Sequence, residues 1–264
     1  MQSLLKRIES VPGECTLEHE LSSSSISKVF LCILNGTKAV IRFDLPIASK
    51  LAVDRKNELN LLKSITHLDL APKILYSDQA AGILIWKYLP GAEPIFNQAH
   101  LNQYSLHALG SCLYSIHSTP ISKSFIDIFS NSMSLYQALL DSPSEKFLFN
   151  KSLNLYNKLA NDGVSQVFSH NDLHSSNLLW DKKYYFLDWE YSSLNHPCFD
   201  IASLVRSFHL NESQIHDFAV GYGLKSKLFD LGTLNQWIKF IEYLEKIWEI
   251  SLMKIKENLK SDTR

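Results

Sequence analysis

Two short motifs in the second half of the chain constrain its fold and chemistry more than any other feature. The first is His170-Asn171-Asp172, with Asn177 five residues after the acid, and the second is Asp188 at the end of an apolar run. Phosphoryl transfer needs one carboxylate to accept a proton, and an amide and a second carboxylate to hold magnesium on the nucleotide phosphates. Two oxygen ligands suit Mg²⁺, which keeps waters and takes further ligands from phosphate. The motifs therefore predict Asp172 as the catalytic base and Asn177 and Asp188 as magnesium ligands.

The run around the second motif resembles that of small-molecule kinases with the protein-kinase-like fold: choline/ethanolamine kinases, thiamine kinases and aminoglycoside phosphotransferases. Residues 186–191, Phe-Leu-Asp-Trp-Glu-Tyr, followed by Asn195 and residues 199–201, Phe-Asp-Ile, are similar to the choline-kinase pattern, and thiamine kinases share Asp-Trp-Glu-Tyr. The resemblance implies an α+β, two-lobed fold with a small antiparallel sheet lobe and a larger, mainly helical lobe. We expect the nucleotide-binding lobe at residues 1–88 and the catalytic and substrate-binding lobe at residues 89–264.

Composition and charge exclude several other classes of protein. The 264 residues carry 26 basic and 27 acidic side chains, interspersed along the chain, so no strong field points to nucleic acid or a membrane surface. The four cysteines lack Cys-x-x-Cys pairing and are expected to be reduced thiols. No apolar run approaches membrane-spanning length, and residues 1–9 lack the apolar core of a signal peptide. We expect a soluble cytoplasmic protein, monomer or homodimer, without a nucleic-acid or membrane partner.

The first part of the chain has the pattern of a β-hairpin. Residues 29–34 and 38–43 are rich in β-branched and aromatic side chains, and Asn35-Gly36 between them is a hairpin turn signal. A serine-rich run precedes the hairpin, and in the family it resembles this loop usually carries glycines. Two interpretations remain open: a nucleotide-covering flap, with Ser25 and Ser27 near the phosphates, or an ordinary polar surface loop.

The resemblance also implies how a nucleotide would be held. Arg42 stands where the family's second strand carries its phosphate-binding base, and Glu58 in the helix predicted over residues 52–62 is its expected partner. Alternatively, these two are solvated charges on a strand edge and a helix face. Residues 82–89 predict a buried strand that resembles the family's hinge, where backbone groups of Lys87 and Leu89 would bond the adenine edge. Any buried strand followed by Pro-Gly looks similar, so an ordinary strand end also remains open.

Helical periodicity dominates the rest of the chain. We expect helices over residues 101–117, 134–140, 147–159, 201–208 and 234–259, a connector over residues 71–77, and a turn at residues 161–163 after which residues 164–168 lead into the first motif. His117 is interpreted as a packing or capping residue. His170 is expected to hold the catalytic loop by hydrogen bonds rather than to transfer protons. Asp200 is expected to cap the helix that follows it.

The last predicted helix carries aromatic side chains beside carboxylates. Trp248 and Tyr243 lie among Glu242, Glu245 and Glu249, an arrangement that can hold a cationic substrate. An aromatic stripe at helical spacing is also typical of a core, so this alternative stays open. Glu190 has two interpretations: it binds a second metal ion, or it faces a cationic substrate.

The sequence therefore predicts ATP- and magnesium-dependent phosphorylation of a hydroxyl on a small cationic alcohol. Choline or ethanolamine is the first hypothesis, thiamine the second and an aminoglycoside the third. A protein kinase is disfavoured because Asn171 replaces the usual arginine and no Ala-Pro-Glu segment follows Asp188. A non-catalytic nucleotide-binding module remains as a hypothesis of a different class, supported by the serine-rich run alone.

Overall fold

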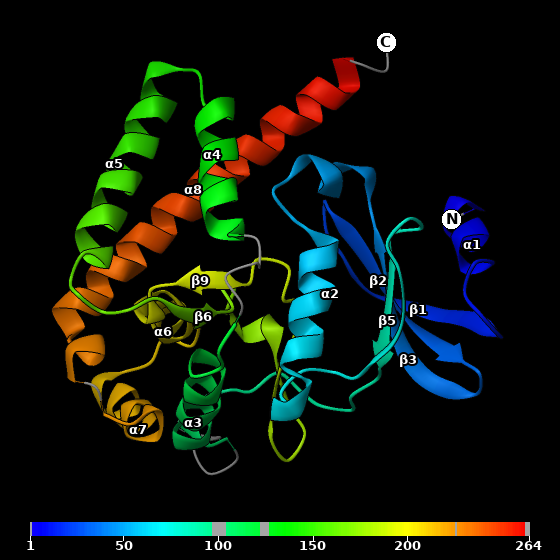
Figure 1. The fold of residues 1–264 in the computed structure, drawn as a ribbon, viewed down its shortest axis with the longest axis horizontal. Helices are drawn as coiled ribbons and strands as arrows, with labels where there is room; N and C mark the ends of the chain where they lie inside the picture. The colour runs from blue at the N-terminus through cyan, green and yellow to red at the C-terminus, as the bar shows by residue number, and fades with distance from the viewer. Residues whose placement is uncertain (1, 97–103, 122–126, 225, 262–264) are drawn as a thin grey trace.

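The computed structural model describes residues 2–96, 104–121, 127–224 and 226–261 in two lobes (Figure 1). The first lobe is a five-stranded antiparallel sheet with strand order β1-β2-β3-β5-β4. Its elements are α1 (Gln2–Ile8), β1 (Cys15–Ser23), β2 (Ser27–Leu34), β3 (Thr37–Asp44), η1 (Pro46–Lys50), α2 (Arg55–Ser64), η2 (Thr66–Leu68), β4 (Ile74–Asp78) and β5 (Ile83–Lys87). The predicted antiparallel sheet lobe is confirmed, and the boundary at residues 88 and 89 stays a prediction.

The second lobe is mainly helical and carries two small strand pairs, β6 with β9 and β7 with β8. The long helix α8 runs from the side of α5 towards the sheet lobe (Figure 1). The elements are α3 (Leu106–His117), α4 (Ile128–Leu139), α5 (Pro143–Ala160), β6 (Val167–Ser169), η4 (Ser175–Asn177), β7 (Leu178–Trp180), β8 (Tyr184–Phe186), β9 (Ser193–Asn195), α6 (Pro197–Ser207), α7 (Glu212–Tyr222), η5 (Ser226–Phe229) and α8 (Leu231–Ser261).

The hairpin of β2 and β3 gives the sheet two different faces. Leu34 pairs with Thr37 across a tight turn in which Asn35 and Gly36 both have positive φ, as the sequence predicts. Alternate residues of a strand point to opposite faces, so Ile41 packs with the apolar cluster that includes α1 while Arg42 points to the side of α2. The alternation of side chains along β3 therefore places Arg42 on the face of the sheet that meets the helical lobe.

Several elements differ from the sequence-based expectations. The connector expected over residues 71–77 contains strand β4, and β1 and α7 were not anticipated. Helix α3 is described from Leu106, with Ser105 as its N-cap, and residues 97–103 lie outside the described part of the chain. Helix α6 begins at Pro197, and the ring of His196 accepts the capping bond. The expectation that Asp200 caps this helix is therefore wrong, because Asp200 lies inside its first turn.

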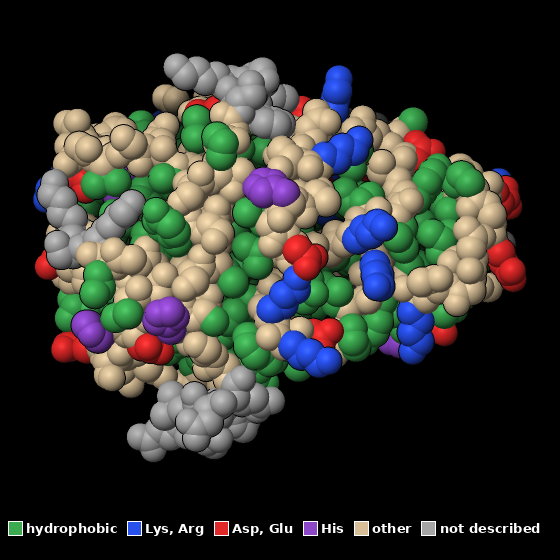
Figure 2. All heavy atoms as spheres, turned by 60° about the horizontal axis from the view of Figure 1, so that its bottom comes forward, with side chains coloured by type: hydrophobic (Ala, Val, Ile, Leu, Met, Phe, Trp, Pro, Cys, Tyr) green, Lys and Arg blue, Asp and Glu red, His purple; other side chains and the backbone are tan. Residues whose placement is uncertain are grey.

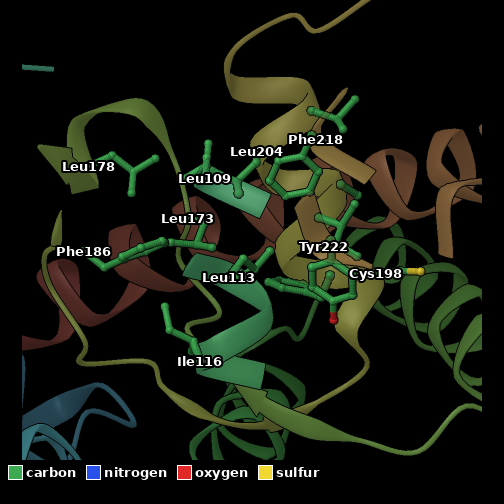
Figure 3. Packing of buried hydrophobic residues seen from close by; sticks show 14 of the residues in the cluster. Leu109, Leu113, Ile116, Leu173, Leu178, Phe186, Cys198, Leu204, Phe218 and Tyr222 are labelled. Carbon is green, nitrogen blue, oxygen red and sulfur yellow. The ribbon is translucent and has the colours of Figure 1, made fainter. Parts of the chain in front are cut away.

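The core of the helical lobe is built where α3, α6 and α7 meet. Figure 3 shows Leu109 and Leu113 of α3 beside Leu204 of α6 and Phe218 of α7. Helices α3 and α7 approach so closely that a Cβ atom on Gly110 would lie 2.1 Å from the carbonyl oxygen of Phe218. Glycine at this position therefore sets the distance between the two helices.

The surface carries mixed charge. On the face that Figure 2 presents, Lys and Arg side chains gather towards the centre and right, with acidic side chains among them. None of the helices in the described ranges has the length and apolar character that crossing a bilayer requires.

We expect Gly110→Ala to lower the free energy of unfolding by about 1–3 kcal/mol, because the added methyl group forces backbone atoms of two packed helices apart. Urea unfolding followed by circular dichroism measures this change. Gly232→Ala in the first turn of α8 is the matched control, since the nearest atom to its new Cβ is a side-chain oxygen 3.2 Å away. Equal stability of the two variants would contradict the close-packing argument.

Candidate active site

A cavity of about 880 Å³ lies between the two lobes. Both lobes contribute lining residues, and the described residues of the wall include eight of the positions that the sequence singles out. These eight are Ser27, Arg42, Glu58, Asp172, Asn177, Asp188, Glu190 and Trp248. Side chains that are far apart in the chain thus share one wall, as a binding site requires.

Asp200 anchors the loop that carries the first motif. Its buried carboxylate accepts hydrogen bonds from the backbone N–H of His170 at 2.7 Å and of Asn171 at 2.9 Å. His117 lies 3.1 Å from the same carboxylate and 2.6 Å from the hydroxyl of Tyr222. His117 is therefore a packing residue, as the sequence predicts, and Asp200 is a structural residue with a different partner from the one expected.

His170 joins the two motifs. It is fully buried, and its Nε2 donates to the carbonyl of Leu187 at 2.8 Å, immediately before Asp188. Burial lowers the pKa of His170 to about 4, so the ring stays neutral near pH 7. A neutral imidazole with its donor already engaged suits a positioning role rather than proton transfer, in line with the expectation.

Asn171 is a site residue whose role was not recognised in the sequence. Its φ of 65° is left-handed, a region that Asn tolerates better than most residues. Its Nδ2 donates to the carbonyl of Tyr191 and to Ser193 Oγ, and its Oδ1 accepts from Asn195. Asn171 thereby ties the loop of the first motif to the segment that follows Asp188.

Hydrogen bonds connect Asn177 both to Asp172 and to the residue before Asp188. Its Nδ2 donates to the backbone carbonyl of Asp172 at 2.8 Å and to Asp172 Oδ2 at 3.1 Å. These bonds use the amide nitrogen and leave Oδ1 as the atom for a metal ion. The carbonyl of Asn177 also accepts from the N–H of Leu187, next to Asp188.

Arg42 and Glu58 form a bidentate ion pair. The two guanidinium nitrogens lie 2.9 and 2.6 Å from the carboxylate oxygens, and the residues are only 5% and 3% exposed. The alternative of two solvated charges is therefore wrong. Arg42 Nη1 also lies 3.4 Å from Asp188 Oδ1, which connects this ion pair of the sheet lobe to the second motif.

Arg55, in the first turn of α2, is a second arginine that the sequence analysis missed. Its guanidinium contacts Glu58 at 3.0 Å, Asp44 at 2.9 Å and Glu190 at 2.5 Å. Glu190 is 3% exposed and points to α2, so its nearest cation is an arginine of the other lobe. The ion pairs thus link the two lobes through four carboxylates and two arginines.

Negative charge is in excess around the cavity. Burial and the nearby Glu190 raise the pKa of Asp172 to about 7, and burial raises that of Asp188 to about 6 although Arg42 opposes the rise. The exposed parts of both side chains line the cavity, where protein walls replace bulk water. Burial and Asp188 also raise the pKa of Glu190, and Arg55 opposes that rise.

The donor set fits Mg²⁺. Among the described residues, no group of three or more His, Cys, Asp and Glu side chains is arranged as a protein cage for a metal ion. Asn177 and Asp188 offer an amide and a carboxylate oxygen. Around them, the carboxylates that line the cavity outnumber the arginines. Mg²⁺ is usually bound by one or two such ligands, with the remainder from phosphate and water.

The serine-rich run forms the tip between β1 and β2. Ser24 Oγ accepts from the N–H groups of Ile26 and Ser27, at 3.2 and 3.0 Å, and so closes the turn. Ser22, Ser24 and Ser27 line the cavity, whereas Ser25 is not among the lining residues and accepts a hydrogen bond from Lys256. Ser27 therefore lies where the flap interpretation expects it, and Ser25 does not.

The expected hinge lies at the end of β5. The N–H of Lys87 donates to the carbonyl of Lys73, so any adenine contact from Lys87 would use its carbonyl oxygen. Trp86, one residue earlier, lines the cavity. The contacts expected from Lys87 and Leu89 stay predictions.

Part of the cavity wall is aromatic and acidic. Trp248 Nε1 donates to the hydroxyl of Tyr191 at 3.3 Å, and Tyr136 and Glu249 line the same cavity. Tyr243 is not among the lining residues, and Lys151 and Lys239 each lie 5.2 Å from its ring centre. Tyr243, which the sequence offers as a residue that holds a cationic substrate, therefore lies outside the described cavity wall.

Arg55→Met should lower the free energy of unfolding by about 3 kcal/mol, because it leaves Glu190 buried without its cation. Lys56→Met, at the exposed neighbouring position, is the matched control and should have little effect. Urea unfolding of both variants measures the difference. A loss no larger than that of the control would contradict the interlobe role of Arg55.

Comparison with known proteins shows which proteins this chain is related to. The sequence model of the phosphotransferase enzyme family matches residues 19–237. Protein LicA of Haemophilus influenzae is 29% identical over 218 residues, which cover 74% of this chain and 60% of the relative, so the chain spans less than two thirds of that protein's length.

Two solved structures share the architecture. Choline kinase LicA from Streptococcus pneumoniae superposes with a TM-score of 0.74 at 19% identity, covering 95% of this chain and 89% of the other. LicA in complex with AMP gives a TM-score of 0.75 at 19% identity, covering 96% and 90%. At these identities the likeness shows the fold, and it confirms the kinase-like architecture predicted from the sequence.

Proposed function

The chain belongs to the phosphotransferase enzyme family, and from this premise we propose that it transfers the terminal phosphoryl group of ATP to the hydroxyl of a small molecule. The observation that carries the proposal is the shared cavity wall of Asp172, Asn177, Asp188 and the Arg42–Glu58 pair. These groups supply a base, two magnesium ligands and a fixed cation, which is the set that phosphoryl transfer uses.

In the proposed reaction, Asp172 orients the hydroxyl of the acceptor and takes its proton. A bond forms between the acceptor oxygen and the γ-phosphorus, the bond from that phosphorus to the bridging oxygen of ADP breaks, and ADP leaves. The amide of Asn177 holds the Asp172 carboxylate in place by its 3.1 Å bond. Catalysis of this kind depends mainly on positioning and charge neutralisation, which preorganised side chains provide.

Asn177 and Asp188 would hold Mg²⁺ through their side-chain oxygens. When bound with nucleotide, the ion neutralises charge on the phosphates. Arg42, fixed by Glu58, would add a second positive group on the phosphate side. The excess of carboxylates over arginines around the cavity supports this assignment, since a divalent cation would balance it.

We propose choline or ethanolamine as the acceptor. Tyr136, Tyr191 and Trp248 line the cavity together with Glu249, and aromatic faces beside a carboxylate suit a cationic group. Relatives named as LicA, one of them described as a choline kinase, support the same choice. Glu190 is not proposed as the substrate carboxylate, because Arg55 already neutralises it.

Thiamine and an aminoglycoside remain the alternative acceptors, and a non-catalytic nucleotide-binding protein remains the alternative of a different class. Ser24 closes the turn with its own hydroxyl, so the serine-rich run is an ordered tip and not evidence against catalysis. Turnover on any acceptor would exclude the non-catalytic alternative.

The first experiment measures ADP release from Mg-ATP with choline, ethanolamine, thiamine and kanamycin tested separately. We expect turnover with choline or ethanolamine, and we expect Asp172→Asn to lower kcat by about 10²–10⁴-fold because the hydroxyl loses its proton acceptor. Asp217→Asn, on the exposed face of α7, is the matched control and should keep full activity. Nucleotide binding without turnover on any of the four would contradict the proposed substrates.

A second prediction concerns the acceptor end of the cavity. Trp248→Leu should raise KM for the acceptor about threefold to thirtyfold, since it removes an aromatic face from a cation. Tyr243→Leu on the same helix should leave KM unchanged, because Tyr243 lies outside the described cavity wall. Steady-state kinetics on both variants measures the contrast, and equal effects would count against the aromatic pocket.

A further inference from the structure

The last turns of α8 reach the sheet lobe and pack against the serine turn. Leu252 and Ile255 of α8, 7% and 5% exposed, form an apolar cluster with Ile26, which directly follows Ser24-Ser25. Ile47 and Leu51, which follow β3, belong to the same cluster. This cluster therefore joins the C-terminal helix to the tip that borders the nucleotide end of the cavity.

A polar contact accompanies the apolar one. Lys256 Nζ donates to Ser25 Oγ at 2.7 Å, although the two residues are 231 positions apart in the chain. Ser25 precedes Ile26, and both lie within the turn that Ser24 closes. The turn is thus held internally by Ser24 and externally by α8.

The same face of α8 carries acceptor-side residues. Trp248 lines the cavity, and Leu252, Ile255 and Lys256 follow it by four, seven and eight residues, which places them along one side of the helix. One rigid element thereby contacts both the acceptor end of the cavity and the serine turn.

We propose that Ile255 and Lys256 are positioning residues of the nucleotide site, which act by holding the serine turn over the phosphates. The inference rests on the proposed function, because it takes the cavity beside Ser24 and Ser27 as the nucleotide end. Strand β1 lies at the edge of the described sheet, and the N–H of Leu45 donates to the carbonyl of Ile26 at 2.8 Å, so backbone bonds hold the tip from the side of β3. Burial of Ile26 against α8 adds an apolar contact and limits the positions that the turn adopts.

The test uses the full chain and a non-hydrolysable ATP analogue, with Mg²⁺ and without acceptor. Titration calorimetry measures its Kd for the wild type, Ile255→Ala and Lys256→Ala. We expect Ile255→Ala to weaken binding about fivefold or more. Lys256→Ala should weaken it about twofold, as for an exposed polar contact. Lys256→Arg and Ile255→Leu, which keep the donor and the apolar contact, should restore wild-type affinity.

Two controls separate positioning from general loss of structure. Met253→Ala lies on the exposed side of α8, where Met253 is 57% exposed, and should leave the Kd unchanged. Urea unfolding of each variant shows whether the fold is intact under the assay conditions. With an acceptor that the wild type phosphorylates, Ile255→Ala should raise KM for ATP. Its KM for the acceptor should stay within about twofold of the wild-type value.

An unchanged Kd in Ile255→Ala, with or without a loss of stability, would overturn the inference. Failure of the proposed function looks different: the wild type would bind the analogue yet turn over none of the acceptors, and the comparison of Kd values would still decide the role of α8. A wild type that binds no nucleotide would overturn both.

Discussion

The ion pairs between the lobes are the interaction on which the site depends. Arg42 and Arg55 come from the sheet lobe, while Asp188 and Glu190 come from the loop after β8, and Glu58 holds both arginines. Removing a charge from such a buried set leaves its partner without compensation, which costs far more than the loss of an exposed pair. The network therefore holds the two lobes together beside the cavity.

Backbone anchoring completes the arrangement. Asp200 accepts hydrogen bonds from two N–H groups in the loop of the first motif, and Asn171 and His170 connect that loop to the segment around Asp188. Both Asn171 and Asp188 have left-handed φ values, which Asn and Asp adopt more readily than other non-glycine residues. The residue types at these positions are thus set by backbone conformation as well as by chemistry.

The sequence predicted the parts of the site that are local in the chain. Asp172, Asn177 and Asp188 lie within one short stretch, so their spacing could be recognised in the sequence. The turn signal Asn35-Gly36 likewise predicts the hairpin that carries Arg42. Arg55 was missed because its bond to Glu190 joins residues 135 positions apart. No local pattern distinguishes such an arginine from a solvated one.

Two missed elements have different explanations. Strand β1 lies at the sheet edge and is exposed along most of its length, so it lacks the alternating pattern of a half-buried strand. Helix α7, in contrast, carries a signal that the sequence shows: a capping box of Asn211 and Gln214, followed by buried residues at helical spacing.

The wrong assignment of Asp200 as a helix cap arose because the N–H groups that it binds belong to a loop about 30 residues earlier in the chain.

The packing of α8 against Ile26 and Leu51 has a consequence for synthesis of the protein. A chain emerges from the ribosome N-terminus first, and its early parts begin to fold before the later parts exist. The apolar side of the serine turn and of η1 is covered by Leu252 and Ile255, which follow both of these segments in the chain and are made long after them. During translation this surface stays open to water and to chaperones, and it is covered only when α8 has been released.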